Sequence, residues 1–338
     1  MLEMEMQSTN CVEFPADGEV AIKADETPKR FEFSNVFGPE STQDNVFEQI
    51  EPLVTSTLDG YNVCIFAYGQ TGSGKTYTME GPKHNPGVNY RTLQKFFSVR
   101  QQRKDDLEMK LKVSVLEIYN ECIYDLLTGK QDSLDIRVQE KEGVYVQGLE
   151  EINCDSMEDV TNAMKLANKN RSTGDHKMNQ HSSRSHLVLT ITSETIDKIS
   201  GQTSRGKLSL VDLAGSERVS KTDATGERLK EAQNINRSLS ALGDVIAALH
   251  EKKKHVPFRN SKLTFLLQNS LGGNSKVAMF VNISPVQSNA QETTCSLNFA
   301  SRCHEVALGQ AKRSSLQRSS GSKILTPKKT RKGSKTLK

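Results

Sequence analysis

The chain has 338 residues, of which 35% are hydrophobic and 25% are charged, a size and composition that fit one large α/β domain with insertions. It contains no run of the ~20 apolar residues that a membrane-spanning helix needs, and its first residues (MLEMEM) are too acidic for a signal peptide. We therefore expect no membrane insertion.

The net charge of +4 hides two regions of opposite sign. From Ala311 onward there are ten Lys or Arg residues and no acid, which leaves 35 basic and 41 acidic side chains in residues 1–310. We predict a mildly acidic globular domain over residues 1–313 and a basic, disordered tail over residues 314–338. The six cysteines show no C-x-x-C pairing, so we expect free thiols in a reducing compartment.

The predicted elements alternate between strands and helices along the chain. Residues 12–34 predict short strands of a small antiparallel sheet. Ser41 or Thr42 can cap a helix that runs to about residue 58. Further helices are expected near residues 75–78, 90–100, 156–169, 227–250, 260–271 and 289–306, and strands near 63–68, 109–119, 186–192, 207–213 and 277–283. This alternation predicts an α/β fold with a mostly parallel central sheet and helices on both faces.

A phosphate-binding loop follows the apolar strand at residues 63–68. It matches the pattern G-x-x-x-x-G-K-[ST] without a mismatch, over Gly69, Gln70, Thr71, Gly72, Ser73, Gly74, Lys75 and Thr76. Glycines let the backbone N–H groups turn inward toward phosphate oxygens, Lys75 can reach the β- and γ-phosphates, and the Thr76 hydroxyl can ligate Mg²⁺. The alternative is a glycine-rich turn that matches by chance, which the preceding strand disfavours.

Two further segments fit the same chemistry. The strand at 207–213 reaches Asp212 and is followed by Gly215; in P-loop proteins such an Asp holds Mg²⁺ through water, and such a glycine amide senses the γ-phosphate. A hydroxyl-rich stretch at 179–186 can close on the γ-phosphate and Mg²⁺, with Arg184 and Glu217 as opposite charges that latch the two segments together. The alternatives are an ordinary strand end and a serine-rich turn.

These motifs together resemble the kinesin motor domain. The resemblance rests on AYGQTGSGKTYTM (67–79), EIYNE (117–121), SSRSH (182–186), DLAGSE (212–217) and HVPFRNSKLT (255–264), and covers roughly residues 12–313. Residues 308–313 (LGQAKR) are similar to the C-terminal-motor, minus-end-directed subfamily. The resemblance implies a P-loop NTPase fold and an ATPase that uses ATP and Mg²⁺ and is stimulated by microtubules.

The resemblance also implies roles for individual residues. Residues Gly69 to Thr76 would cradle the phosphates, and Tyr77 would pack on the adenine. Thr76 and Ser183 would ligate Mg²⁺, with Asp212 behind them. Ser182 and the Gly215 amide would read the γ-phosphate, while Arg184 and Glu217 would form the latch and position the attacking water.

A basic strip corresponds to the family's microtubule-binding face. It comprises Arg218, Lys221, Arg228, Lys230, Arg237, Lys252, Lys253, Lys254, Arg259 and Lys262. The alternative for Lys252–Lys254 is a solvated helix end, which the helix dipole also favours. On an otherwise acidic domain, a local basic strip is better explained as a site for an acidic polymer.

The sequence departs from the family at its start. Kinesin motors open with a strand and an Arg-x-Arg-Pro-like segment, and neither is found before Cys11. We therefore predict a kinesin motor fold that is incomplete at the N-terminus, with dimerisation only through regions absent from this chain. Losing an interior strand exposes apolar neighbours and unpaired backbone groups.

Two functions follow from these observations. The first is an ATP-dependent microtubule motor, minus-end-directed, working in the cytoplasm on the microtubule cytoskeleton, including the spindle. The second is a microtubule-binding module whose ATPase is impaired because the adenine-side strand is missing. A third function, that of an unrelated P-loop GTPase or kinase, is disfavoured because the guanine-reading pattern Asn-Lys-x-Asp is absent and because the motifs at 182–186 and 212–217 are similar to those of kinesins. No nucleic-acid partner is expected.

Overall fold

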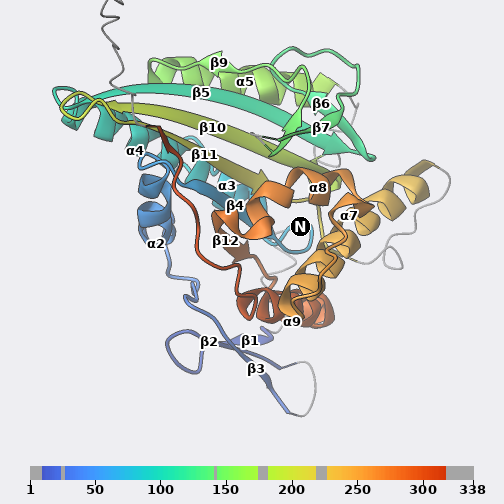
Figure 1. Cartoon of the computed structure of the whole chain (residues 1–338). Coiled ribbons are helices and arrows are strands. Elements are labelled where there is room, and N and C mark those ends of the chain that lie inside the picture. The colour runs from blue at the N-terminus through green and yellow to red at the C-terminus, as the bar shows by residue number, and fades with distance from the viewer. Residues whose placement is uncertain (1–9, 24–26, 141–142, 174–181, 218–226, 317–338) are drawn as a thin grey trace, which may run out of the picture.

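The computed structural model describes residues 10–23, 27–140, 143–173, 182–217 and 227–316 (Figure 1). A central sheet runs through it in the order β12-β4-β11-β10-β5-β6, with β9 paired to β5 and β13 paired to β11. These strands are β4 (Asn62–Tyr68), β5 (Leu107–Tyr119), β6 (Cys122–Asp125), β9 (Ile152–Asn153), β10 (Ser185–Asp197), β11 (Thr203–Asp212), β12 (Ser275–Val281) and β13 (Ser315–Leu316).

The α/β fold class is confirmed, but the sheet is mixed and not mostly parallel. Only β12, β4 and β11 run parallel to one another, whereas β11, β10, β5 and β6 pair antiparallel. The reason lies in the connections. β10 and β11 form a long hairpin joined by only five residues, too few for the helical crossover that a parallel pair requires. β5 turns into β6 through Asn120 and Glu121, both at positive φ, as a two-residue hairpin turn needs.

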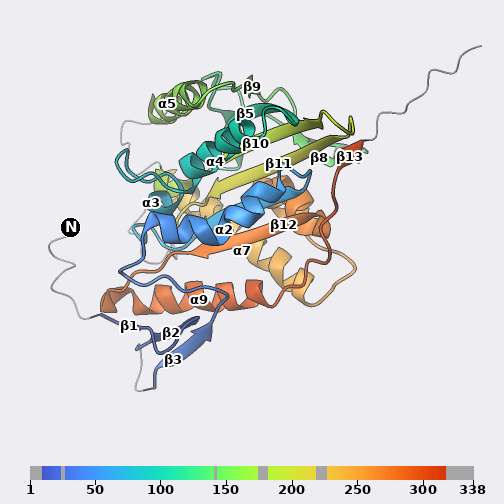
Figure 2. The ribbon, with the colours of Figure 1, turned by 90° about the vertical axis from the view of Figure 1, so that its left-hand side faces the viewer.

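Helices cover both faces of the sheet, as predicted (Figure 2). One face carries α2 (Gln43–Ser56), α4 (Val88–Gln102) and α5 (Met157–Thr173), and the other carries α7 (Glu227–His250), α8 (Lys262–Leu266) and α9 (Ala290–His304). Thr42 caps α2 through a reciprocal hydrogen-bond pair with Asn45. None of the described helices has the length and apolar character to cross a bilayer.

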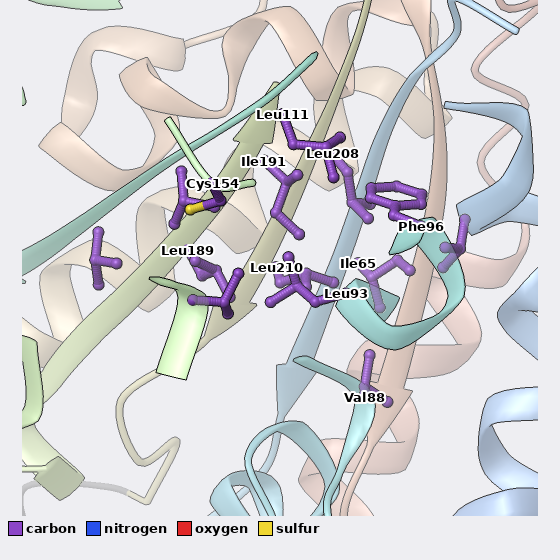
Figure 3. Close-up of a cluster of buried hydrophobic side chains, with 14 of the residues drawn as sticks. Ile65, Val88, Leu93, Phe96, Leu111, Cys154, Leu189, Ile191, Leu208 and Leu210 are labelled. Atoms are coloured by element: carbon purple, nitrogen blue, oxygen red, sulfur yellow. The ribbon is translucent and has the colours of Figure 1, made fainter. Parts of the chain in front are cut away.

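The core explains why β4 is apolar along almost its whole length. In β4, Val63 and Ile65 pack on the side of α4, while Cys64 and Phe66 pack on the side of α7. Successive strand side chains point to opposite faces, so a strand that is buried on both faces is apolar at every position. Figure 3 shows the first of these two layers, with strand residues from β4, β10 and β11 against Leu93 and Phe96 of α4.

Several predicted boundaries need correction. The helix expected at 260–271 is instead a 3₁₀ turn (Phe258–Asn260), the short α8, and a π-type turn (Ser270–Asn274) that Gly273 breaks at φ 93°. The hairpin of β7 (Ile136–Gln139) and β8 (Gly143–Val146) was not predicted. The predicted tail begins too early, because β13 pairs with residues 203–204 of β11; residues 317–338 lie outside the described part of the chain.

A small antiparallel sheet lies below α9 and confirms the prediction for residues 12–34. It consists of β1 (Val12–Glu13), β2 (Glu19–Ile22) and β3 (Lys29–Glu32), and its apolar face packs on Ala290 and Leu297 of α9. Asn10 and Cys11 connect this sheet to residues 285–286, just beyond the end of β12.

The second edge of β12 is open among the described residues. Six of its seven residues are half-buried, and a cavity of about 750 Å³ runs along it between α2 and α9. Val46 and Leu53 of α2, Met279 of β12 and Leu297 of α9 line this cavity, and Ser73 and Thr78 beside the phosphate-binding loop also reach it. This edge is where the predicted gap in the sheet leaves apolar groups and backbone groups without a neighbouring strand.

Candidate nucleotide-binding site

The phosphate-binding loop lies at the carboxyl ends of β4 and β11. It connects β4 to the short helix α3 (Lys75–Met79), as the sequence predicted. The parallel pairing of these two strands places Asp212 opposite Ala67, so the loop and the segment after β11 start side by side. Carboxyl ends of neighbouring parallel strands are the usual ligand-binding edge of an α/β sheet.

Glycines permit the loop's shape at three positions. Gly69, Gly72 and Gly74 adopt φ of 151°, 80° and 102°, a region that other residues rarely enter. At Gly69 there is also no space, since a Cβ atom would lie 2.0 Å from the carbonyl oxygen of Asn282. The loop therefore depends on glycine for conformation and for its close approach to the end of β12.

Lys75 is held inside the loop. Its Nζ donates to the carbonyl oxygens of Gly69 and Gln70, at 2.8 and 2.9 Å, and only 7% of the residue is exposed. Burial lowers the pKa of Lys75, and the nearby carboxylates of Asp212 and Glu217 oppose that shift. The ammonium is therefore a cation with little solvent around it, which strengthens its attraction to a phosphate.

Thr76 and Asp212 meet as a magnesium site requires. The Thr76 hydroxyl donates to Oδ2 of Asp212 at 2.7 Å, while the buried Oδ1 of Asp212 accepts no hydrogen bond from the described residues. Burial raises the pKa of Asp212, because a carboxylate without water is costly. A cation-bound water beside Oδ1 would satisfy that oxygen, so these two residues fit Mg²⁺.

The hydroxyl-rich segment at 182–184, here called the first switch, and residues 213–217 after β11, here called the second switch, are joined through their backbones. Ser182–Arg184 form one 3₁₀ turn, and the Gly215 N–H donates to the Ser183 carbonyl at 2.9 Å. A Cβ on Gly215 would lie 2.3 Å from Thr71 Oγ1 and from a Glu217 carboxylate oxygen. Glycine at 215 thus lets the second switch lie directly against the phosphate-binding loop.

The predicted Arg184–Glu217 latch is not the pairing in this structure. The Arg184 guanidinium donates to Glu231 of α7 at 2.8 Å. The Glu217 carboxylate accepts from the backbone N–H of Thr71 at 2.8 Å and from the Thr71 hydroxyl. Glu231 extends from α7 to Arg184. The Glu217 carboxylate accepts a hydrogen bond from a backbone N–H of the phosphate loop, a group of the kind that binds anions.

Tyr77, which is predicted to pack on the adenine, is exposed directly after the phosphate-binding loop. It is 55% exposed, an unusual state for a large aromatic side chain, and its hydroxyl accepts a hydrogen bond from Asn85 at 3.2 Å. Its exposed ring is open to contact with a ligand, and the stacking of adenine on Tyr77 stays a prediction.

Sequence reasoning missed the polar residues buried behind the site. Arg171 at the end of α5 pairs with Glu117 of β5 at 3.0 Å and donates to Ser185, with both charged side chains almost fully buried. His186 is 2% exposed, and burial together with Lys75 and Arg171 lowers its pKa to about 3. For Glu117 the available signal was a carboxylate inside an otherwise apolar stretch of strand (residues 115–119, VLEIY).

The predicted microtubule face is partly described. Lys230 and Arg237 are exposed on α7, Lys252, Lys253 and Lys254 are exposed just after it, and Arg259 is exposed before α8. Lys262 is half-buried and lies 3.7 Å from Asp135. Arg218 and Lys221 lie outside the described residues, as does the side chain of Arg228. Helices α7 and α8 lie beside one another, so the described positions share one side of the molecule (Figure 1).

Comparisons with known proteins agree with this geometry. A family model described as "Kinesin motor domain" matches residues 3–306. The chain is 52% identical over 300 residues to the rice "Kinesin-like protein KIN-14E", with 88% of this chain and 28% of the relative covered. It is 51% identical over 309 residues to the Arabidopsis thaliana "Kinesin-like protein KIN-14Q", covering 89% of this chain and 26% of that relative. The chain thus spans about a quarter of the length of these curated relatives.

Solved structures show the same likeness. A structure described as that of a fast kinesin superposes with a TM-score of 0.87 at 39% identity, covering 98% of this chain and 95% of the other. The motor domain of the Kar3-like kinesin from Ashbya gossypii gives a TM-score of 0.75 at 44% identity, covering 86% and 91% of the two chains. Both comparisons support the predicted fold, and the KIN-14 and Kar3-like matches support the predicted subfamily resemblance.

Proposed function

The chain belongs to the kinesin motor domain family, and we propose that it hydrolyses MgATP, couples hydrolysis to microtubule binding, and moves toward the microtubule minus end. The observation that carries this proposal is the convergence of three segments at one edge of the sheet. Lys75 lies in the phosphate loop, the Thr76–Asp212 pair lies beside it, and the Gly215 amide reaches the carbonyl of Ser183.

In the proposed reaction the protein acts by positioning and by charge. Phosphoryl transfer needs little covalent chemistry from the protein, so no strong base is required. Lys75 and the loop amides would hold the β- and γ-phosphates. Mg²⁺, held by Thr76 and Ser183 with Asp212 behind them, would neutralise charge on the phosphate oxygens when bound. The Gly215 amide and the Ser182 hydroxyl would sense the γ-phosphate, while Arg184 and Glu217 would orient the attacking water.

The direction of movement is proposed from the relatives. The KIN-14 and Kar3-like similarities favour the minus-end-directed subfamily that residues 308–313 resemble. We propose the microtubule cytoskeleton, including the spindle, as the site of action, and dimerisation only through segments outside this chain.

Nucleotide-dependent binding tests the coupling. Microtubule co-sedimentation with the full chain should show tighter binding with the non-hydrolysable analogue AMP-PNP than with ADP, by about tenfold, a usual size for coupling between two sites. Equal affinities in the two nucleotide states would favour the alternative, a microtubule-binding module that no longer cycles.

The open edge of β12 is relevant to that alternative, because the alternative attributes an impaired ATPase to a missing strand. We expect a seven-residue apolar strand added ahead of Asn10, with a linker long enough to lie along β12, to raise the melting temperature by a few degrees and tighten ATP binding. It would cover half-buried side chains, and it would pair backbone groups of β12 that have no strand partner on that side within the part of the chain that the structure describes, beside Ser73 and Thr78. Thermal unfolding and fluorescent-nucleotide titration measure the two effects.

A matched extension with proline at alternate positions provides the control, because proline cannot donate to the ladder. If the apolar and the proline-containing extensions change neither quantity, or change both equally, the edge of β12 does not need a partner strand.

The basic tail is proposed to contact the filament. Eight Lys or Arg residues lie in residues 317–338, beyond β13, and none is matched by an acid there. We expect deletion of residues 317–338 to weaken microtubule affinity strongly at low salt and weakly at high salt, since the Debye length is already only ~10 Å at 0.1 M. Phosphorylation of Thr326, which adds about −1.5 to −2 charges, should weaken it in part.

Co-sedimentation across a salt series measures this effect. A tail of equal length with glutamine in place of Lys and Arg separates charge from length and should behave like the deletion. Identical salt slopes for the full chain and both variants would show that the tail does not touch the filament.

A further inference from the structure

Four successive backbone N–H groups after β11 connect the second switch to its surroundings. Each donates to a different segment of the site: Leu213 to the Ala67 carbonyl (3.3 Å), Ala214 to His186 Nδ1 (3.0 Å), Gly215 to the Ser183 carbonyl (2.9 Å) and Ser216 to the Gly69 carbonyl (3.1 Å). Three of the four acceptors are backbone carbonyls. The fourth, at Ala214, is a side chain, and it does not end at the nucleotide site.

That side chain reaches α7. His186 starts near the amino end of β10, is 2% exposed, and its Nε2 lies 2.7 Å from the hydroxyl of Ser238. The Ser238 hydroxyl in turn donates to the Ile235 carbonyl at 2.8 Å, one turn earlier in the same helix. Ala214, His186 and Ser238 are all buried, so water cannot replace these contacts.

The direction of these hydrogen bonds follows from their ends. Ala214 can only donate through its N–H, so Nδ1 of His186 is an unprotonated acceptor. Nε2 therefore carries the proton and donates to Ser238, whose own proton goes to Ile235. The lowered pKa of His186 agrees with this neutral form. The hydrogen-bonded chain from Ala214 through His186 and Ser238 to Ile235 therefore has one set of donor directions in which every polar group is satisfied.

We propose that His186 is a positioning residue that couples the segment 213–216 to α7 through Ser238. This inference rests on the proposed function, in which that segment reads the γ-phosphate and α7 carries exposed cations of the microtubule face. When residues 213–216 move, either α7 must follow or buried hydrogen-bonding groups are left without partners, which is costly in a dry interior. Because one ring nitrogen of His186 contacts Ala214 and the other contacts Ser238, this coupling does not require the residues that would hold the metal and the phosphates to change.

Two substitutions remove the hydrogen bond between His186 and Ser238 of α7. Ser238→Ala removes the hydroxyl, and His186→Asn keeps an acceptor near the Nδ1 position while losing the reach to Ser238. Ser240→Ala is the matched control, because Ser240 lies two residues further along α7 and is exposed. Thermal melting and circular dichroism establish that each variant is folded.

We expect Ser238→Ala to leave basal ATP turnover unchanged and to lower microtubule-stimulated turnover about tenfold, the usual size for loss of coupling between two sites. Ser240→Ala should change neither rate. His186→Asn should lower stimulation to the same degree, and the double variant should lose no more than either single variant, because both remove the same link.

Other results would overturn the proposal. Full stimulation in Ser238→Ala, or a double variant whose loss equals the combined losses of the two singles, would show that the contact carries no coupling. A fall of basal and stimulated turnover together, with a lower melting temperature, would assign His186 a role in stability alone.

A readout without microtubules separates this inference from the proposed function. In the wild-type chain, adding AMP-PNP and Mg²⁺ should change amide hydrogen exchange in residues 227–250, and Ser238→Ala should abolish that change while nucleotide binding persists. If wild-type turnover is not stimulated by microtubules, the proposed function fails, and hydrogen exchange still decides the inference. An exchange response that is the same in wild type and Ser238→Ala overturns it.

Discussion

Lys75→Ala is expected to lower ATP turnover by about 10²- to 10³-fold, the range seen when one preorganised electrostatic group is removed from a reacting centre. Lys75 is the cation inside the phosphate loop, and its Nζ is already within hydrogen-bond distance of two loop carbonyls. Phosphate release or a coupled-enzyme assay measures the rate. ATP binding should weaken as well, because the β- and γ-phosphates lose a positive charge that solvent does not screen.

Lys83→Ala is the matched control, since Lys83 is an exposed lysine eight residues further along the chain. It should leave turnover unchanged. A folded Lys75→Ala protein that hydrolyses ATP at a near wild-type rate would show that the nucleotide site has been placed in the wrong part of the molecule.

Asp212→Asn is expected to lower ATP turnover at ordinary magnesium concentrations and to raise the magnesium concentration needed for half-maximal rate by about 10- to 100-fold. That is the usual cost of losing a residue that supports metal ligands from behind. Asparagine keeps the size of the side chain and can still accept from Thr76, so the change removes mainly the charge near Oδ1.

Magnesium titration distinguishes this variant from the lysine variant. Turnover by Asp212→Asn should recover substantially at high Mg²⁺, whereas turnover by Lys75→Ala should not. An unchanged magnesium requirement in a folded Asp212→Asn protein would contradict a role for Asp212 behind the metal.

The phosphate loop was predictable because its chemistry is local. Glycines at fixed spacing, a lysine and a hydroxyl residue follow an apolar strand, and each is needed for a backbone shape or a charge that neighbours in sequence largely determine. The structure accordingly begins α3 at Lys75 and places Asp212 beside Thr76.

Strand direction was less predictable. Apolar periodicity reports which faces of a strand are buried, and β10 and β11 are buried in the same manner whether they run parallel or antiparallel. The five-residue connection between β10 and β11 requires the antiparallel direction. The predicted strands ended several residues too early, so the connection looked longer than it is. The broken segment at 260–274 was missed for a related reason. Gly273 turns the chain into the left-handed region, where a Cβ atom would lie 2.7 Å from the carbonyl oxygen of Leu308, and the sequence gives no sign that Leu308 lies so close.

Partner choice within the site could not be predicted either. The sequence contains acidic residues on two segments that could pair with Arg184, and opposite charge alone cannot choose between Glu217 and Glu231. The choice depends on where α7 lies relative to the first switch. His186 posed the same difficulty, because a histidine at the start of a strand gives no indication that Ser238, 52 residues later, will be its partner.

ATP turnover by the full chain as a function of microtubule concentration tests the central claim most directly, with Lys75→Ala as the blank. We predict a low basal rate that rises and saturates as microtubules are added, at concentrations similar to those that bind the chain in co-sedimentation. A chain that binds microtubules while its turnover stays at the basal rate would contradict the proposed motor and leave a microtubule-binding module.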